Sequence, residues 1–78
     1  MEFVRRLGST PHERGSLNNA TCPDLFEMSD GNFAVIGTDL TAELEGKLPA
    51  GAARAAHERI VVITRETLVA AKSDIPES

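Results

Sequence analysis

The sequence predicts a small α+β fold, in which a sheet of about three strands packs with two short helices. Three observations predict it. Two apolar stretches flank an Asp-Gly pair within residues 25–37, which is a strong hairpin signal. A run of β-branched residues at 59–63 indicates another strand. Segments 39–48 and 65–72 carry the residues that start and stop helices.

The hairpin is expected to have strands at residues 25–29 and 32–37, which leaves Asp30 and Gly31 as its turn. Successive side chains of a strand point to opposite faces. One face is expected to be buried and carries Phe26, Met28, Phe33 and Val35. Leu25 and Ile36 fall on the other face, and the candidate interaction surface consists of Leu25, Phe33 and Ile36.

The first helix is predicted over residues 39–48, where leucines recur at every fourth position as one apolar stripe. Thr38 or Asp39 can accept the free amide protons at its start, and Pro49 ends it. A carboxylate at the end of a strand is also a common catalytic position. Helix capping is the favoured interpretation of Asp39, because the leucine stripe follows it directly.

The strand at 59–63 is expected to be central, since four successive β-branched residues suit a strand that is covered on both faces. Val62→Asp is therefore expected to prevent folding. Thr64 is placed to cap the last helix, at 65–72, with Leu68 and Ala71 facing inward.

The chain of 78 residues is divided into an arm, a domain and a tail. Turn-forming residues are dense in residues 8–23, so 1–23 is expected to be a flexible or extended arm, although 1–7 fits a short strand or a helical turn. The single α+β domain is expected at 24–73, followed by a polar tail at 74–78. A core of this size stabilises a fold weakly, and a three-stranded sheet exposes two edges. A homodimer or a protein partner is therefore expected.

Charge and composition disfavour several classes of protein. The net charge is −4, from 8 basic and 12 acidic residues, and the chain has no Trp or Tyr. Direct nucleic-acid binding is disfavoured on these grounds, because it needs basic patches and stacking platforms. Neither a secretory leader nor a membrane span is expected, and the lone Cys22 suits a reducing compartment, so the expected location is cytoplasmic.

Three residues are the candidates for chemistry: Cys22, Asp39 and His57. A catalytic cysteine needs a base and a means of lowering its pKa, but Cys22 precedes a predicted strand rather than a helix. Histidine is a residue type often used for acid-base chemistry, which makes His57 a candidate, although a loop histidine is the simpler interpretation. No catalytic residue, cofactor or metal site is assigned.

The stretch from residue 22 to residue 71 resembles the BldB-like family of small actinomycete proteins. The resemblance rests on a cysteine, an acidic residue, an apolar hairpin and a strand that ends near an aspartate, namely Cys22, Glu27, Asp30-Gly31, Val35-Ile36 and Asp39. The chain departs from the pattern because it has no tryptophan and carries an insert at 41–56. The resemblance implies a self-associating, non-enzymatic accessory to transcriptional regulation that works beside a helix-turn-helix protein.

Two functions remain open on the sequence. The first is a non-enzymatic protein-interaction module, an accessory to transcriptional regulation or to a biosynthetic pathway. The alternative is a small enzyme or ligand-binding subunit of such a pathway, with Cys22, Asp39 and His57 converging within hydrogen-bond reach.

Overall fold

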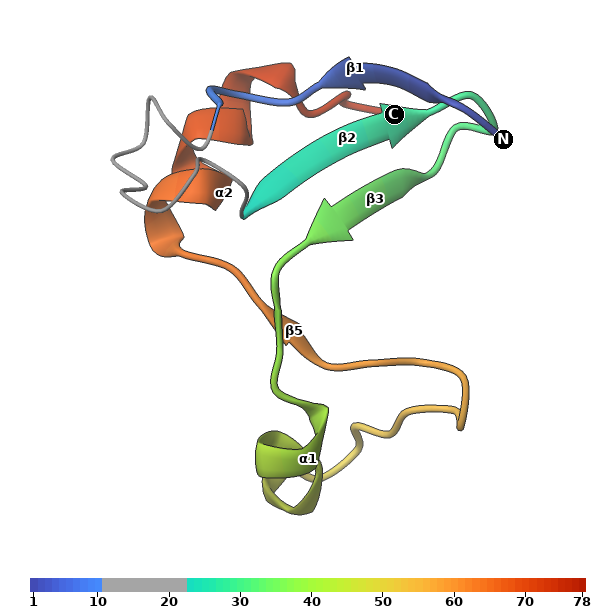
Figure 1. Cartoon of the computed structure of the whole chain (residues 1–78), viewed down its shortest axis with the longest axis vertical. Helices are drawn as coiled ribbons and strands as arrows, with labels where there is room; N and C mark the ends of the chain where they lie inside the picture. Colours follow the sequence, from blue (N-terminus) through green and yellow to red (C-terminus); the bar gives the residue numbers. More distant parts are fainter. Residues whose placement is uncertain (11–22) are drawn as a thin grey trace.

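A computed structural model describes residues 1–10 and 23–78 and confirms the α+β class. Strands β1, β2 and β3 form an antiparallel sheet (Figure 1). Strands β4 and β5 form a separate two-stranded ribbon. In chain order the elements are β1 (Phe3–Arg6), β2 (Asp24–Met28), β3 (Phe33–Ile36), β4 (Thr38–Asp39), α1 (Thr41–Leu44), the 3₁₀ turn η1 (Glu45–Lys47), β5 (Val61–Val62), α2 (Arg65–Ala71) and the 3₁₀ turn η2 (Lys72–Asp74).

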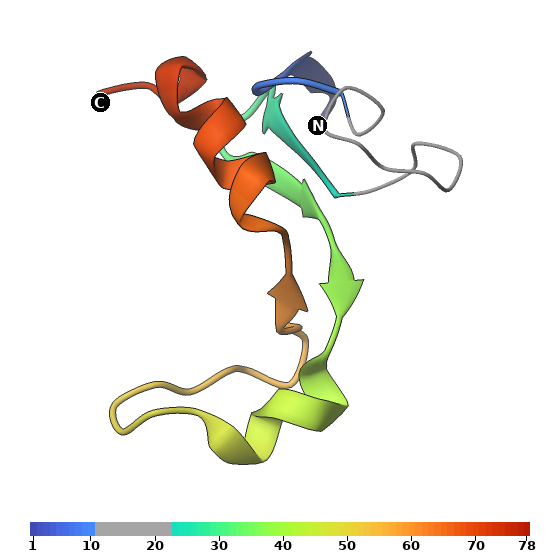
Figure 2. The ribbon, with the colours of Figure 1, turned by 90° about the vertical axis from the view of Figure 1, so that its left-hand side faces the viewer.

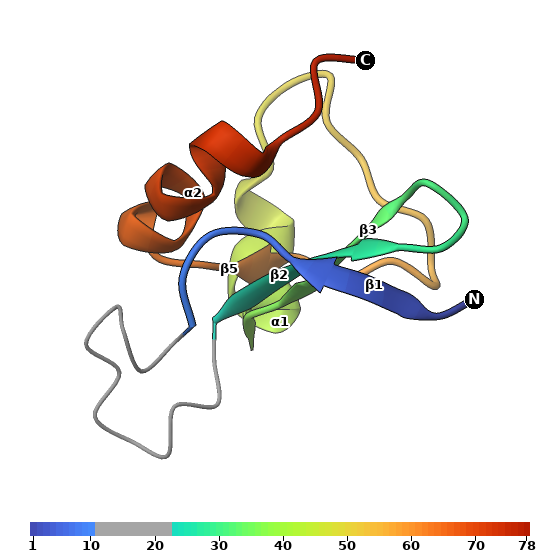
Figure 3. The same ribbon diagram turned by 90° about the horizontal axis from the view of Figure 1, so that it is seen from above.

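The molecule has two parts. We call residues 1–10, 23–36 and 63–78 the body, in which α2 lies beside one face of the three-stranded sheet (Figure 3). We call residues 37–62 the arm, which contains the ribbon and α1 and extends away from the body (Figure 2).

The hairpin forms as predicted, but its turn is one residue longer than expected. The amide of Met28 donates to the carbonyl of Asn32 at 2.8 Å, which closes a three-residue loop, Ser29 to Gly31. Gly31 has φ of +89° and ends this loop in the left-handed region. A turn followed by a left-handed glycine is the common form of three-residue hairpin loops, and glycine adopts it without a steric penalty.

The longer turn changes which side chains share a face. Leu25 lies opposite Val35, and Glu27 lies opposite Phe33. A shift of one residue in register moves the side chains of a strand to the other face relative to its partner. The expectation that Phe33 and Val35 are buried with Phe26 and Met28 is therefore wrong.

Burial follows this register. Leu25 lies on the face opposite Phe26 and Met28, as expected, and it is only 7% exposed because α2 covers that face. Phe33 and Val35 share that face and remain 46% and 45% exposed, because the helix does not reach across the sheet. On the open face, the ring of Phe26 meets Phe3 edge to face.

The third strand of the sheet is β1, which pairs with β2, and not the segment at 59–63. From that segment only Val61–Val62 forms a strand, and it pairs with β4 in the arm. Val61 and Val62 are 39% and 42% exposed, so the prediction of a central strand covered on both faces is wrong. The β-branched run indicated extended backbone correctly, but not its place in the fold.

The core of the body is small and gathers where the chain leaves β1. Leu7, Leu25 and Ala71 are buried together, with Ile63 packed against them. Gly8 has φ of +77°, and a Cβ there would come within 2.9 Å of the α2 backbone at Ala70. Glycine is needed at this point because the chain passes directly against the helix.

The last helix confirms the prediction for 65–72. The hydroxyl of Thr64 accepts the amide of Thr67 at 3.2 Å, as a helix cap does. Thr67 and Ala71 face the sheet and are fully buried, whereas Leu68, expected inward, is 54% exposed.

The N-terminal residues belong to the body. Arg5 donates to the carbonyl of Asp74 at 2.8 Å, and the amide of Gly8 donates to the Asp74 carboxylate at 2.7 Å. The N-terminal segment 1–23, predicted to be flexible or extended, therefore begins as an edge strand of the body. Residues 11–22 lie outside the described part of the chain.

Candidate functional site

Polar side chains gather in the arm, where α1 meets β5. The Asp39 carboxylate accepts hydrogen bonds from the Thr41 amide at 3.0 Å and from the Thr41 hydroxyl at 2.7 Å. The Thr41 hydroxyl in turn accepts the amide of Ile60 at 2.7 Å. We call these three residues the latch, because they tie the start of α1 to the strand that returns to the body.

The helix expected over 39–48 is shorter in the structure, as α1 followed by η1. Asp39 satisfies the first free amide as predicted, although it lies two residues before α1. Leu40, Leu44 and Leu48 are half-buried, in agreement with a single apolar stripe.

Arg54 links η1 to the long loop between η1 and β5. Its guanidinium donates to the carbonyls of Ala55 and Glu58, both at 3.0 Å, and pairs with the Glu45 carboxylate at 2.5 Å. Its Nε atom is buried and has no hydrogen-bond partner in the described structure. The side chain thus joins η1 to residues 55–58 through hydrogen bonds and an ion pair.

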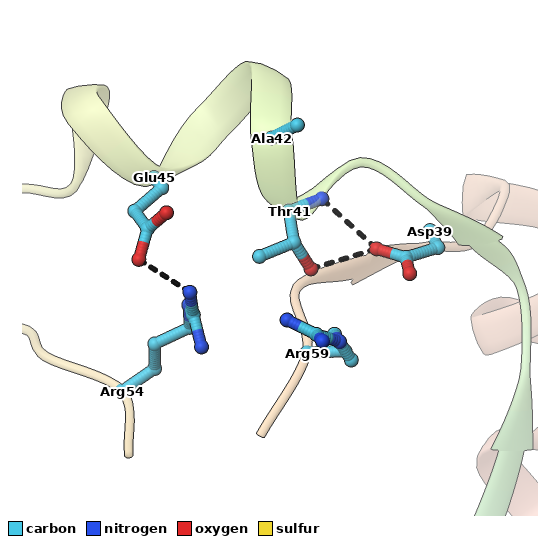
Figure 4. Close-up of a pocket in the computed structure, with 6 residues that line it drawn as sticks. All are labelled: Asp39, Thr41, Ala42, Glu45, Arg54 and Arg59. Atoms are coloured by element: carbon cyan, nitrogen blue, oxygen red, sulfur yellow. Dashed lines mark hydrogen bonds and ion pairs between the residues drawn. The ribbon is translucent and has the colours of Figure 1, made fainter. Parts of the chain in front are cut away.

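These groups surround a hollow of about 340 Å³ on the surface of the arm. It is lined by Asp39, Thr41, Ala42, Glu45, Arg54 and Arg59 (Figure 4). Arg59 extends beneath Thr41 into this space and forms no ion pair with residues 1–10 or 23–78.

The electrostatics of the hollow keep Asp39 ionised. The hydroxyl and then the amide of Thr41 hold the pKa of the Asp39 carboxyl below its usual value, partial desolvation opposes this, and the charges of Arg59 and Arg54 add a smaller lowering. A carboxylate with a lowered pKa is a weak proton acceptor at neutral pH. The network is therefore better suited to holding the arm together than to transferring protons.

The structure brings only one of the three chemical candidates into this hollow. Asp39 lines it, whereas His57 is exposed and is not among its lining residues. Cys22 lies outside the described residues. Within the described ranges, no group of three or more histidine, cysteine, aspartate or glutamate side chains could hold a metal ion.

Apolar exposure is the dominant feature of the rest of the surface. Among the residues described, the buried apolar side chains are Leu7, Leu25, Met28 and Ala71. Eleven large apolar side chains are exposed: Met1, Phe3, Val4, Phe33, Val35, Ile36, Val61, Val62, Leu68, Val69 and Ile75. Among the described residues, exposed large apolar side chains thus outnumber the buried ones, and where such side chains form a contiguous patch they are typical of a surface that meets another molecule.

In the body, part of this surface forms two hollows that are both lined by Leu68. One, of about 180 Å³, is lined by Leu7, Leu25, Phe33, Leu68 and Ile75. The other, of about 350 Å³, is lined by Ile63, Thr64, Arg65, Leu68 and Val69. We call the two hollows together the apolar groove.

The predicted interaction residues divide between core and surface. Phe33 lines the apolar groove, Ile36 is exposed on the opposite face, and Leu25 forms the floor of the groove within the core. Sequence reasoning missed Leu68 and Val69, because helical periodicity marks Leu68 as an inward position and gives no measure of how much sheet lies beneath it.

No helix in the described residues is both long and apolar enough to cross a membrane. In the comparisons with known proteins, no family model, no curated protein and no solved structure matches the chain.

Proposed function

We propose that this protein is a non-enzymatic protein-interaction module, which binds another protein chain through the exposed apolar surface of its body. The observation that supports it is the balance of apolar side chains in the described residues, where eleven large ones are exposed, nine of them in the body, and four apolar ones are buried. A partner that covers them would add the apolar burial that so small a core lacks, at about 25 cal/mol per Å² of buried area.

The polar hollow of the arm supports the same proposal. An enzyme of this size would place its chemistry in such a hollow, yet the hydrogen bonds there hold α1, β5 and the connection of the arm to one another. We propose a cytoplasmic accessory role, in transcriptional regulation or in a biosynthetic pathway, with a second copy of the chain as the first partner to test.

Light scattering and thermal unfolding across a dilution series test this function. We expect a mass above the 8.4 kDa of one chain at high micromolar concentration, and an unfolding temperature that falls on dilution. A fluorescent dye that binds exposed apolar surface should bind the dilute protein more strongly than the concentrated one. A folded monomer whose stability is independent of concentration, and which binds no such dye, would refute the proposal.

A further inference from the structure

The two edges of the three-stranded sheet differ in how they are protected. On β1 the charged side chains of Arg5 and Arg6 follow one another, and the register shifts between Phe3 and Arg5. Charged residues and bulges are two of the devices by which sheets prevent their edge strands from pairing with other chains. The β1 edge is therefore blocked.

The β3 edge carries neither device. Its four residues, Phe33–Ile36, are all apolar, and the register with β2 runs without interruption from Asp24 to Glu27. In the described part of the chain β3 pairs with β2 alone, so its outer backbone groups are available. Phe33, Val35 and Ile36 are each more than 40% exposed.

We infer that the β3 edge pairs antiparallel with the β3 edge of a second copy, which gives one continuous sheet of six strands. The inference rests on the proposed function and names its partner and its surface. Because the other edge is blocked, each copy has one edge to offer, and pairing stops at two copies instead of continuing into a filament.

Symmetry restricts the register of this contact. A two-fold axis relating antiparallel strands runs perpendicular to the sheet, so residues of the same face lie opposite each other. If the axis passes through Ala34, Phe33 lies opposite Val35 of the partner subunit on the α2 face. Aromatic and β-branched side chains form favourable cross-strand pairs. The small Ala34 meets its own copy on the open face.

A register centred on Val35 fits less well, because it places Phe33 opposite Gly37 of the partner subunit. Gly37 is already crowded by β5, since a Cβ there would lie 2.7 Å from the carbonyl oxygen of Val62. The register centred on Ala34 keeps the strand-to-strand pairs within 33–35 and away from this contact.

The net charge of the chain opposes self-association, so it restricts where two copies can meet. Each copy carries a net charge of −4, so an interface between two copies is favoured where charged residues are absent, as they are in β3. The strand is short, and stable interfaces bury about 800 Å² per partner. We therefore expect a dimer that dissociates on dilution.

Charge substitutions test the register, with mass measured by light scattering. Phe33→Lys and Val35→Glu, made singly, should each shift dissociation to at least tenfold higher protein concentration. The double variant should recover most of this loss, because the new ammonium group of one copy would lie opposite the new carboxylate of the other. Val4→Lys, the matched change on the blocked edge, should leave dissociation within twofold of the parent.

Circular dichroism should show each variant folded, since Phe33, Val35 and Val4 lie outside the buried core and are 46%, 45% and 59% exposed. A parent dimer that is indifferent to both single substitutions would overturn this inference and leave the proposed function standing. A folded parent monomer that binds the apolar dye would do the same. A monomer that binds no dye would overturn both.

A disulfide gives a second, independent test, in a Cys22→Ser background. Directly opposite residues of antiparallel strands have Cα atoms about 4.5–5.5 Å apart, which a disulfide can span. Ala34→Cys should therefore yield a covalent dimer under mild oxidation, whereas Val4→Cys should not. A dimer in solution that crosslinks no faster at position 34 than at position 4 would overturn the inference.

Discussion

The body and the arm are held together by different forces. The body buries Leu7, Leu25 and Ala71 between the sheet and α2. In the arm Thr41 is the one buried residue, and its contacts to Asp39 and Ile60 are hydrogen bonds. Apolar burial scales with area, whereas a single hydrogen bond contributes about 1 kcal/mol net. We therefore expect the arm to unfold at a lower denaturant concentration than the body.

An aspartate placed in the body and in the arm should give the largest difference in unfolding free energy between the two parts. Leu25→Asp places an unpaired charge in the core and should abolish folding, because its cost exceeds the roughly 3–5 kcal/mol that a core of this size supplies. Val62→Asp changes a side chain that is 42% exposed and should cost about 1 kcal/mol or less. Urea unfolding followed by circular dichroism measures both. A folded Leu25→Asp protein beside an unfolded Val62→Asp protein would reverse this account of the two parts.

A smaller effect is expected from the latch. Thr41→Val keeps the shape of the side chain but leaves the Ile60 amide without its acceptor, at a cost of about 1–3 kcal/mol. Hydrogen exchange should accelerate at Ile60 and in β5, and remain slow in β2. Thr38→Val, at an exposed threonine of β4, is the matched control and should leave exchange unchanged. Equal acceleration in β2 would show that the arm and the body open as one unit.

The smallest effect is a pH dependence of the latch. The pKa of Asp39 is lower in the folded protein than its unfolded value of about 3.9. A group whose pKa is lowered by folding stabilises the fold above its unfolded pKa, and this contribution disappears as the pH falls through the folded pKa. The NMR shifts of the Thr41 and Ile60 amides should therefore be constant above about pH 5 and change below about pH 4. Asp39→Asn, which keeps an acceptor oxygen, should remove that change.

Local features were predictable where a few neighbouring residues decide them. Thr64 starts α2, Asp39 accepts the amide of Thr41, and the Asp30-Gly31 pair marks the turn of the hairpin. Each depends on contacts between residues that are close together in the chain. For this reason the α+β class and both helices could be inferred from composition and spacing.

The turn length could not be inferred in this way, and it had the larger consequence. An Asp-Gly pair fits loops of two or three residues, and the difference decides whether Phe33 shares a face with Met28 or with Leu25. The candidate interaction surface was therefore partly wrong, because Leu25 lies in the core and not on the surface.

By itself the sequence determined where the backbone is extended, where it turns and where helices begin, because backbone propensities and caps act over a few residues. Only the tertiary structure decided that β1, rather than the valine run of β5, completes the sheet, and that β3 is left as an open edge. The physical reason is that strand pairing joins residues far apart in the chain. A run such as Val61–Val62 has the same propensity at the centre of a sheet as in an exposed ribbon.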